Sequence, residues 1–348
     1  MASPTASPET RPFLLRFWPW LAAVGSGLLL TLCFPPFDVS WLAWVALTPL
    51  ICALWLPKDA HRSHKRPFFL GYVTGIVFFS LVFCWLSSLG TLFHNTTLYG
   101  LSVLLSLVLG LYFAFWGWFV ARLTEPRPES DQSPVDPLFS SGRNLKIGAL
   151  AACAWVMQEW VRGWLFSGFG WNGLGVALHQ NLAMIQAADL AGVLGLSWVV
   201  AFCNVMAVII VRRIIAEIGP QFLKRVRWEF SVTMGVIAGV FAYGVRPLSQ
   251  RPPSGATELK VAMIQPNVPE LDKWDAETED RRLEELDLFT KKAAEAKPDL
   301  IVWPESALPR GMMADETNYN FVKKETQYGD YGLLIGTILT DVSSDETY

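Results

Sequence analysis

The chain has 348 residues, of which 52% are hydrophobic, and a mean hydropathy of +0.32. A soluble domain of this length is less apolar, so the composition excludes an ordinary soluble globular protein. The net charge of −3 says little about partners, and the basic residues lie in loops between apolar runs, so no nucleic-acid signature is present. The five cysteines (Cys33, Cys52, Cys84, Cys153 and Cys203) form no CxxC pair, and we expect neither a disulfide framework nor a zinc site.

The first 247 residues consist of long apolar runs separated by short polar loops. A membrane-spanning helix needs about 20 mostly apolar residues. The start, MASPTASPETRPFLLRF, leads into an apolar segment without a small-residue cleavage pattern, which indicates a retained first helix. We therefore predict a multi-pass helical bundle with seven spans, at 16–34, 40–57, 67–92, 97–122, 146–165, 185–211 and 229–245.

Basic residues gather in alternate loops of this predicted bundle. Lysines and arginines near helix ends stay on the cytoplasmic side, which sets the orientation. We predict a cytoplasmic N-terminus and an outer location for the residues after 250. The basic residues concerned are Arg11, Arg16, Lys58, Arg62, Lys65, Arg66, Arg122, Arg127, Arg143, Lys146, Arg212, Arg213, Lys224, Arg225 and Arg227.

A few polar side chains fall inside the predicted spans. Glu159 and Arg162, in WVMQEWVRGW, are three residues apart and therefore share one helix face. They are either an ion pair that anchors the helix at the membrane interface, or part of a site that faces the outer domain. Gln186 and Asp189 raise the same question.

After residue 258 the pattern changes to that of an α/β domain. LKVAMIQPNV, DLIVWPES and YGLLIGTIL are short apolar strands, and the segments between them have helical spacing, with Leu283, Leu286, Phe289 and Ala293 on one face. Apolar strands alternating with helices predict a helix-covered sheet whose active site lies at the carboxyl ends of its strands.

Glu305 follows such a strand end. It is either a carboxylate near the start of a following turn or helix, where the helix dipole favours it, or a buried general base with a raised pKa. Trp274, in ELDKWDAE, offers a similar choice between packing and a lipid site.

Five stretches, in this order, resemble the apolipoprotein N-acyltransferase family of the nitrilase (carbon–nitrogen hydrolase) superfamily. They are CFPPFDVSW, WVMQEWVRGWLFSGFGW, IQAADLAGVLGLSW, AMIQPNVPELDKWD and IVWPESALP. The resemblance implies a cytoplasmic tail (1–15), a transmembrane domain (16–247), a linker (248–258) and a periplasmic nitrilase-like αββα domain (259–348) in a bacterial inner-membrane protein.

The resemblance also implies a chemistry. A cysteine takes an acyl chain from a phospholipid, usually phosphatidylethanolamine, as a thioester and passes it to the N-terminal α-amine of diacylglyceryl-cysteine in an apolipoprotein. By the same resemblance, Glu305 is the general base of a Glu–Lys–Cys triad and Trp274 is a substrate contact, and neither a cofactor nor a metal is expected. A carboxylate base suits a thiol whose pKa is about 8.5, and a lysine suits the oxyanion.

The family's lysine and cysteine are expected beyond Tyr348, because Lys323 and Lys324 come too early and no cysteine follows Cys203. We therefore expect a C-terminally incomplete α/β domain that is inactive by itself. Two alternatives stay open: a membrane-tethered amidase of the nitrilase class, and a non-catalytic membrane protein that binds lipid or lipoprotein.

Overall fold

The computed structural model describes residues 13–55, 65–124, 140–216, 227–250, 255, 257–269, 275–308, 312 and 315–337. The chain divides into two compact units, Met1–Gln250 and Arg251–Tyr348. Each unit has its own apolar core.

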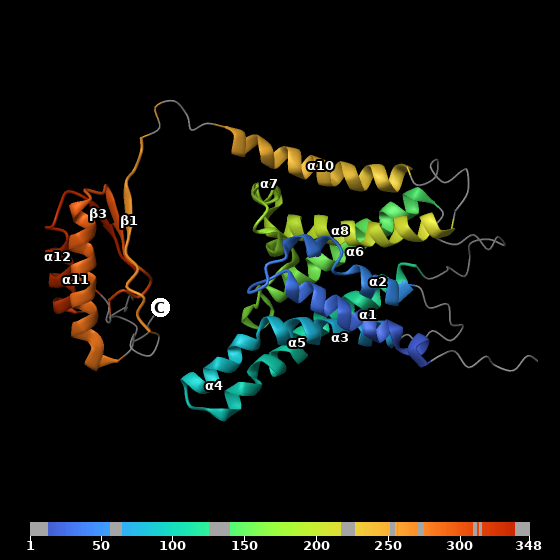
Figure 1. The fold of residues 1–348 in the computed structure, drawn as a ribbon, viewed down its shortest axis with the longest axis horizontal. Helices are drawn as coiled ribbons and strands as arrows, with labels where there is room; N and C mark the ends of the chain where they lie inside the picture. Colours follow the sequence, from blue (N-terminus) through green and yellow to red (C-terminus); the bar gives the residue numbers. More distant parts are fainter. Residues whose placement is uncertain are drawn as a thin grey trace, which may run out of the picture. The chain divides into compact units, whose positions relative to one another are not determined.

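The first unit is helical. Figure 1 shows its long helices α1, α3, α5, α6 and α8 packed alongside one another, with α3 in contact with both α1 and α5, and α6 in contact with α8. The helices are α1 (Phe13–Leu32), α2 (Thr48–Trp55), α3 (Arg66–Val82), α4 (Ser88–Leu92), α5 (Leu101–Arg122), α6 (Ser141–Arg162), α7 (Leu182–Ile185), α8 (Ala188–Ala216) and α10 (Arg227–Ser249). Short 3-10 turns join them: η1 (Ser40–Trp44), η2 (Cys84–Ser87), η3 (Thr96–Gly100), η4 (Leu165–Ser167) and η5 (Leu174–Leu178).

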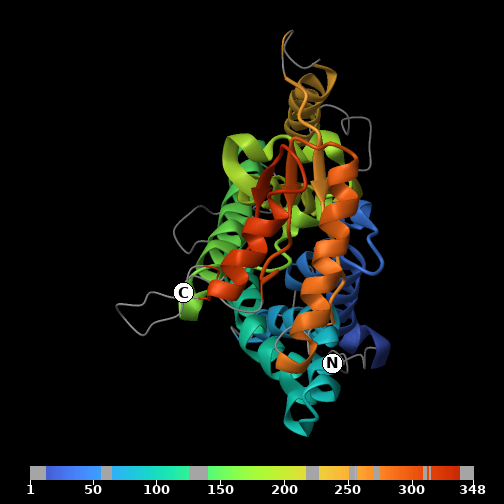
Figure 2. The ribbon, with the colours of Figure 1, turned by 90° about the vertical axis from the view of Figure 1, so that its left-hand side faces the viewer.

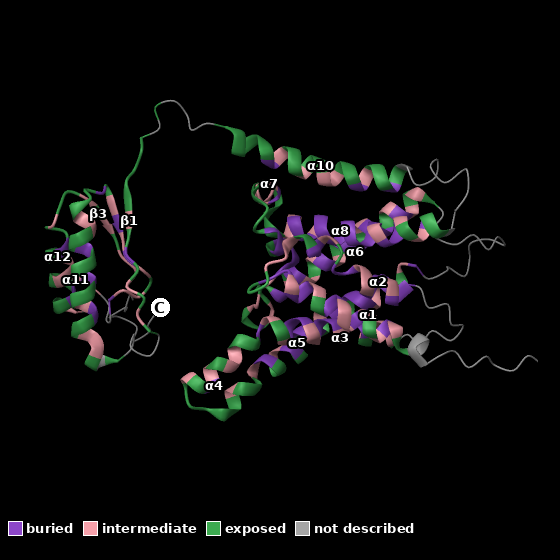
Figure 3. Cartoon of the chain, in the orientation of Figure 1, coloured by how far each residue is buried: buried purple, intermediate pink, exposed green. Residues whose placement is uncertain are grey.

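Three helices in the described residues are long and apolar enough to cross a membrane: Thr96–Arg122, Ala188–Ile215 and Trp228–Ser249. The bent pair Arg66–Val82 and Cys84–Leu92 makes a fourth if it counts as one span. Helix α10 turns most of its apolar surface outward (Figure 3), with Phe230 and Leu248 about half exposed. A helix that is apolar on its exposed side suits a lipid environment, so the unit is compatible with a membrane protein.

Three of the predicted spans are not single straight helices, and in the 185–211 segment the break lies at Ala191 and Gly192 of α8. The 67–92 segment bends by 57° after Val82, where the hydroxyls of Ser87 and Ser88 donate to the carbonyls three residues earlier, at 2.6 Å each, and stabilise a tight turn. The 40–57 segment comprises η1 and the short α2, because Pro49 favours the first turn of a new helix.

Buried polar groups join helices across the first unit. The side chain of Asn204, fully buried in α8, accepts from Leu47 N at 2.9 Å and donates to Ala43 O at 2.8 Å, which ties α8 to the η1–α2 segment. Glu229, fully buried in α10, accepts from Ser141 Oγ at 3.0 Å, Asn144 Nδ2 at 2.9 Å, and Arg213 Nη1. These bonds hold the starts of α6 and α10 against the end of α8.

The second unit is a small parallel sheet with helices on one face. Its strands β1 (Val261–Met263), β2 (Leu300–Val302) and β3 (Gly332–Leu334) pair in that order, all parallel. The helices α11 (Glu279–Glu295, preceded by η7, Ala276–Thr278) and α12 (Glu316–Glu325) lie on the same face of the sheet, as Figures 1 and 2 both show. The predicted alternation of strand and helix is therefore present.

The register of the three strands explains which face of the sheet the helices cover. Ala262, Ile301 and Leu333 pair side by side and point into the core beneath the helices. Their neighbours point the other way, and Met263 and Leu334 are 81% and 57% exposed. The helix face expected from the sequence is partly wrong: Phe289 is exposed and Thr290 is fully buried in its place.

Candidate functional site

The WPES stretch follows β2 and is fixed from two sides. The Trp303 backbone N–H donates to Leu334 O of β3 at 2.8 Å. The Trp303 indole is buried and donates from Nε1 to Thr290 Oγ1 of α11 at 3.1 Å. Since both the sheet and the helix layer hold Trp303, the residues after it start from a defined position.

The backbone beyond β3 packs directly onto the turn formed by Pro304, Glu305 and Ser306. Ala307 N donates to Gly336 O at 3.2 Å. A Cβ on Gly336 would lie 2.7 Å from Pro304 O and 2.8 Å from the Glu305 Cα, so a larger residue there would displace the turn. Ser306 has a φ of +51°, in the left-handed region that reverses the chain.

This packing directs the Glu305 side chain outward. The expectation of a buried carboxylate at this strand end is wrong, because Glu305 is exposed. The close approach of Gly336 fills the inner side of the turn with backbone. An exposed carboxylate at a fixed position can accept a proton from a group that approaches from outside.

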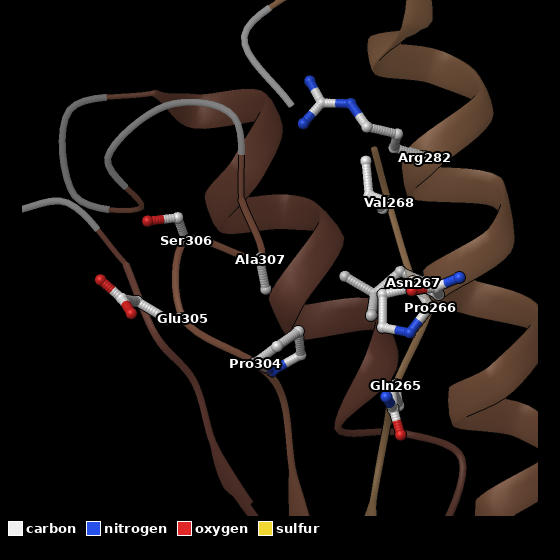
Figure 4. A pocket seen from close by; sticks show the side chains of 10 residues that line it. Gln265, Pro266, Asn267, Val268, Arg282, Pro304, Glu305, Ser306 and Ala307 are labelled. Atoms are coloured by element: carbon white, nitrogen blue, oxygen red, sulfur yellow. The ribbon is translucent and has the colours of Figure 1, made fainter. Parts of the chain in front are cut away.

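Glu305 lines a cavity of about 220 Å³ at the carboxyl edge of the sheet (Figure 4). Its walls are Gln265 to Val268 after β1, Pro304 to Ala307 after β2, and Arg282 and Leu286 of α11. In Figure 4 the Glu305 carboxylate points away from Pro266 and Asn267, and the Arg282 side chain enters from the α11 side. Two stretches singled out in the sequence, AMIQPNV and IVWPESALP, thus meet at one cavity.

Trp274 is the other predicted site residue, whereas Lys324 and the five cysteines were set aside on sequence grounds. Trp274 lies outside the described residues. Lys324 lies on the helix layer, where its Nζ donates to Asp287 Oδ1 at 2.9 Å. All five cysteines belong to the first unit.

A charged cluster lies between α11 and α12 that was not predicted from the sequence. Asp287 accepts from Lys291 Nζ at 2.6 Å, Lys324 Nζ at 2.9 Å and Tyr328 Oη at 2.6 Å. Burial acts to raise the pKa of Asp287, but these hydrogen bonds outweigh it and hold the pKa well below its usual range. Burial, and then the neighbouring Asp287, raise the pKa of Glu325 to about 8. The i,i+4 spacing of Asp287 and Lys291 was the available signal.

Glu159 and Arg162 are both buried at the end of α6, but each has its own partners. Glu159 Oε1 accepts from Trp155 Nε1 and from Leu174 N, both at 2.7 Å. Arg162 Nη1 donates to Trp171 O at 2.6 Å. The two side chains therefore hold the segment that follows α6. Of the other pair, Gln186 Nε2 donates to Leu182 O in the preceding turn, whereas Asp189 accepts from Tyr243 Oη of α10 at 2.8 and 2.9 Å.

The sequence comparisons agree with one another. The family model described as "Apolipoprotein N-acyltransferase N-terminal domain" matches residues 26–206, which is more than half of the chain. Proteins named apolipoprotein N-acyltransferase from Geobacter metallireducens, Rickettsia bellii and Methylococcus capsulatus are 32%, 27% and 25% identical to it, each over 83% of this chain and 51%, 52% and 51% of the relative. The chain spans about half the length of the curated relatives it matches. By the family model and these relatives, the chain belongs to the apolipoprotein N-acyltransferase family.

Proposed function

We propose that the protein takes part in transferring an acyl chain from a phospholipid, with phosphatidylethanolamine the expected donor, to the N-terminal α-amine of diacylglyceryl-cysteine in apolipoproteins. The observation that carries this proposal is the fixed turn after β2, which holds Glu305 at the rim of a cavity on the carboxyl edge of a parallel sheet, with its carboxylate exposed. Family membership and the apolar helices support it. In this proposal the site belongs to a protein with direct access to lipid.

In the proposed reaction Glu305 is the general base. It removes the proton from a cysteine thiol, and the thiolate attacks the ester carbonyl carbon of the phospholipid. The carbon–oxygen bond breaks, the proton passes to the leaving oxygen, and lysophospholipid departs from a thioester. The lipoprotein amine then attacks the thioester carbonyl, the carbon–sulfur bond breaks, and Glu305 passes the amine proton to the departing thiolate, which restores the thiol. The lysine of the triad stabilises the oxyanion in both halves.

The fold at finer detail is part of the same proposal. We assign seven spans, a cytoplasmic N-terminus and a periplasmic nitrilase-like domain from residue 259, in a bacterial inner membrane. The apolar sheet face that carries Met263 and Leu334 supports an αββα arrangement, because a second sheet packed there would remove this surface from water. Trp274 is proposed to contact the lipid substrate.

The test is acyl transfer by the protein expressed from its native gene and reconstituted with phosphatidylethanolamine. A synthetic diacylglyceryl-cysteine peptide is offered as acceptor, and simple primary amides are offered in parallel. Mass spectrometry of the peptide should show one added acyl chain, with no hydrolysis of the amides. Amide hydrolysis without peptide acylation would support a tethered amidase instead. If neither reaction occurred, the remaining candidate would be a protein that only binds lipid or lipoprotein.

A further inference from the structure

The loop between α6 and η5, residues 163–173, exposes large aromatic side chains. Trp164, Phe166 and Trp171 are 54%, 87% and 58% exposed, and Trp160, at the end of α6, is 55% exposed. The sequence from Gly163 to Ala188 contains no Asp, Glu, Lys or Arg. A loop at a protein–water surface would normally carry polar or charged side chains at such positions, so this aromatic loop needs a different surrounding.

Three hydrogen bonds pin the loop to the end of α6. Phe169 N donates to Arg162 O at 2.7 Å, Arg162 Nη1 donates to Trp171 O at 2.6 Å, and Leu174 N donates to Glu159 Oε1 at 2.7 Å. The Glu159 and Arg162 side chains are only 6% and 3% exposed. Burying charged groups is costly, and here both of them fix the backbone of the loop.

A ladder of rings connects the loop to the core. From inside to outside, Phe79 stacks on Phe83 at 5.8 Å, Phe83 meets the edge of Phe169 at 5.1 Å, Phe169 stacks on Trp171 at 6.1 Å, and Trp171 stacks on Trp85 at 5.9 Å. The Arg162 guanidinium lies 5.3 Å from the Phe79 ring centre at the inner end. The loop is thus braced by rings as well as by hydrogen bonds.

The tip of the loop has an uncommon backbone. Phe166, Ser167 and Gly168 have φ angles of +54°, +74° and +81°. A Cβ at Gly168 would lie 2.1 Å from Gly163 O, which only glycine avoids. A phenylalanine in the left-handed region persists only where its surroundings impose it, and the result is a Phe166 ring held outward.

We propose that the aromatic loop is a rigid membrane-interface anchor, seated at the boundary between headgroups and acyl chains, with Glu159 and Arg162 as its positioning residues. Tryptophans concentrate at this depth because their rings are apolar and their N–H groups reach water. The loop leads from α6 toward α8, which is one of the helices able to span a membrane. The absence of Asp, Glu, Lys and Arg from the loop favours lipid over water as the surrounding of the loop. The proposal stands independently of acyl transfer.

Spin labelling measures the depth of the loop. Phe166→Cys is made in a Cys84→Ser, Cys153→Ser background, since those two native thiols are exposed, and the labelled protein is placed in nanodiscs of phosphatidylethanolamine and phosphatidylglycerol. Leu288→Cys, at a 62% exposed position in α11 of the other unit, is the control. We expect the 166 label to collide with oxygen more often than with nickel ethylenediaminediacetate, and the 288 label to show the reverse.

Two results would overturn the anchor. A 166 label as accessible to the nickel complex as the 288 label would place the loop in water. A label inaccessible to both reagents would show that protein covers the loop, whether the other unit or a second copy.

The positioning role has its own readout. Glu159→Gln keeps an oxygen that can accept from Leu174 N, and Glu159→Ala does not. We expect the 166 label to become more mobile in Glu159→Ala and to keep its spectrum in Glu159→Gln. An unchanged spectrum in Glu159→Ala would refute the role of Glu159. The depth measurement needs neither variant. It therefore tests whether the loop lies at the membrane interface even if Glu159→Ala does not fold.

Discussion

Replacing Glu325 by glutamine should make the contact between α11 and α12 insensitive to pH. Glu325 is fully buried in α12, and its pKa is raised to about 8, first by burial and then by Asp287. In the unfolded chain this carboxyl has its ordinary pKa of 4.5. A raised folded pKa means that the contribution of Glu325 to stability is fully present below pH 4.5 and is lost as the pH rises through 8.

The size of the effect follows from the pH interval. Opening here means that α12 separates from α11 and exposes Glu325 to water. Between pH 5 and pH 7 the carboxyl is ionised in this open state and protonated in the folded state. Each pH unit therefore lowers the free energy of opening by about 1.4 kcal/mol. The loss over this interval is about 2–3 kcal/mol, or about a hundredfold in the opening equilibrium. The surrounding groups do not titrate here, because the pKa of Asp287 is lowered and the pKa values of Lys291, Lys324 and Tyr331 are raised.

Hydrogen exchange with mass spectrometry measures this opening in the reconstituted protein. Protection of the amides of 316–325, corrected for intrinsic exchange, should fall between pH 5 and pH 7 in the wild type and stay nearly constant in Glu325→Gln. Glu316→Gln, an exposed change in the same helix, should behave as the wild type does. Equal pH dependence in the wild type and in Glu325→Gln would refute the reasoning.

Three further changes test the packing. Asn204→Leu should lower the unfolding free energy by about 1–3 kcal/mol, seen as a lower thermal midpoint in detergent, because Leu47 N loses its buried acceptor; an unchanged midpoint would contradict this. Glu229→Ala should cost about 3–5 kcal/mol in the same assay, because it removes the buried carboxylate that binds Arg213, and Glu229→Gln should cost less. Gly336→Ala should reduce acyl transfer about tenfold or more with little change in the midpoint, because the methyl group displaces the WPES turn; undiminished transfer would show that the turn's position does not matter.

The sequence predicted those features that depend on local pattern. The strand that contains Ile301 and the amphipathic helix that contains Leu286 both follow from periodicity, and both residues are buried in the core of the second unit. The outward direction of Glu305 was missed because it depends on Gly336, which packs on the turn only through the third strand. The buried role of Glu229 was missed because its partners lie in other helices, a pairing that no local pattern encodes.

The central claim is that Glu305 is the base that activates the nucleophile. The most direct measurement is the rate of acyl-enzyme formation from a labelled phospholipid, followed as hydroxylamine-sensitive label on the protein expressed from its native gene. Wild type and Glu316→Gln should accumulate the thioester, whereas Glu305→Ala and Glu305→Gln should lose it, by about a hundredfold or more in rate, with Glu305→Gln keeping the wild-type fold. Thioester accumulation in Glu305→Ala at the wild-type rate would contradict the account.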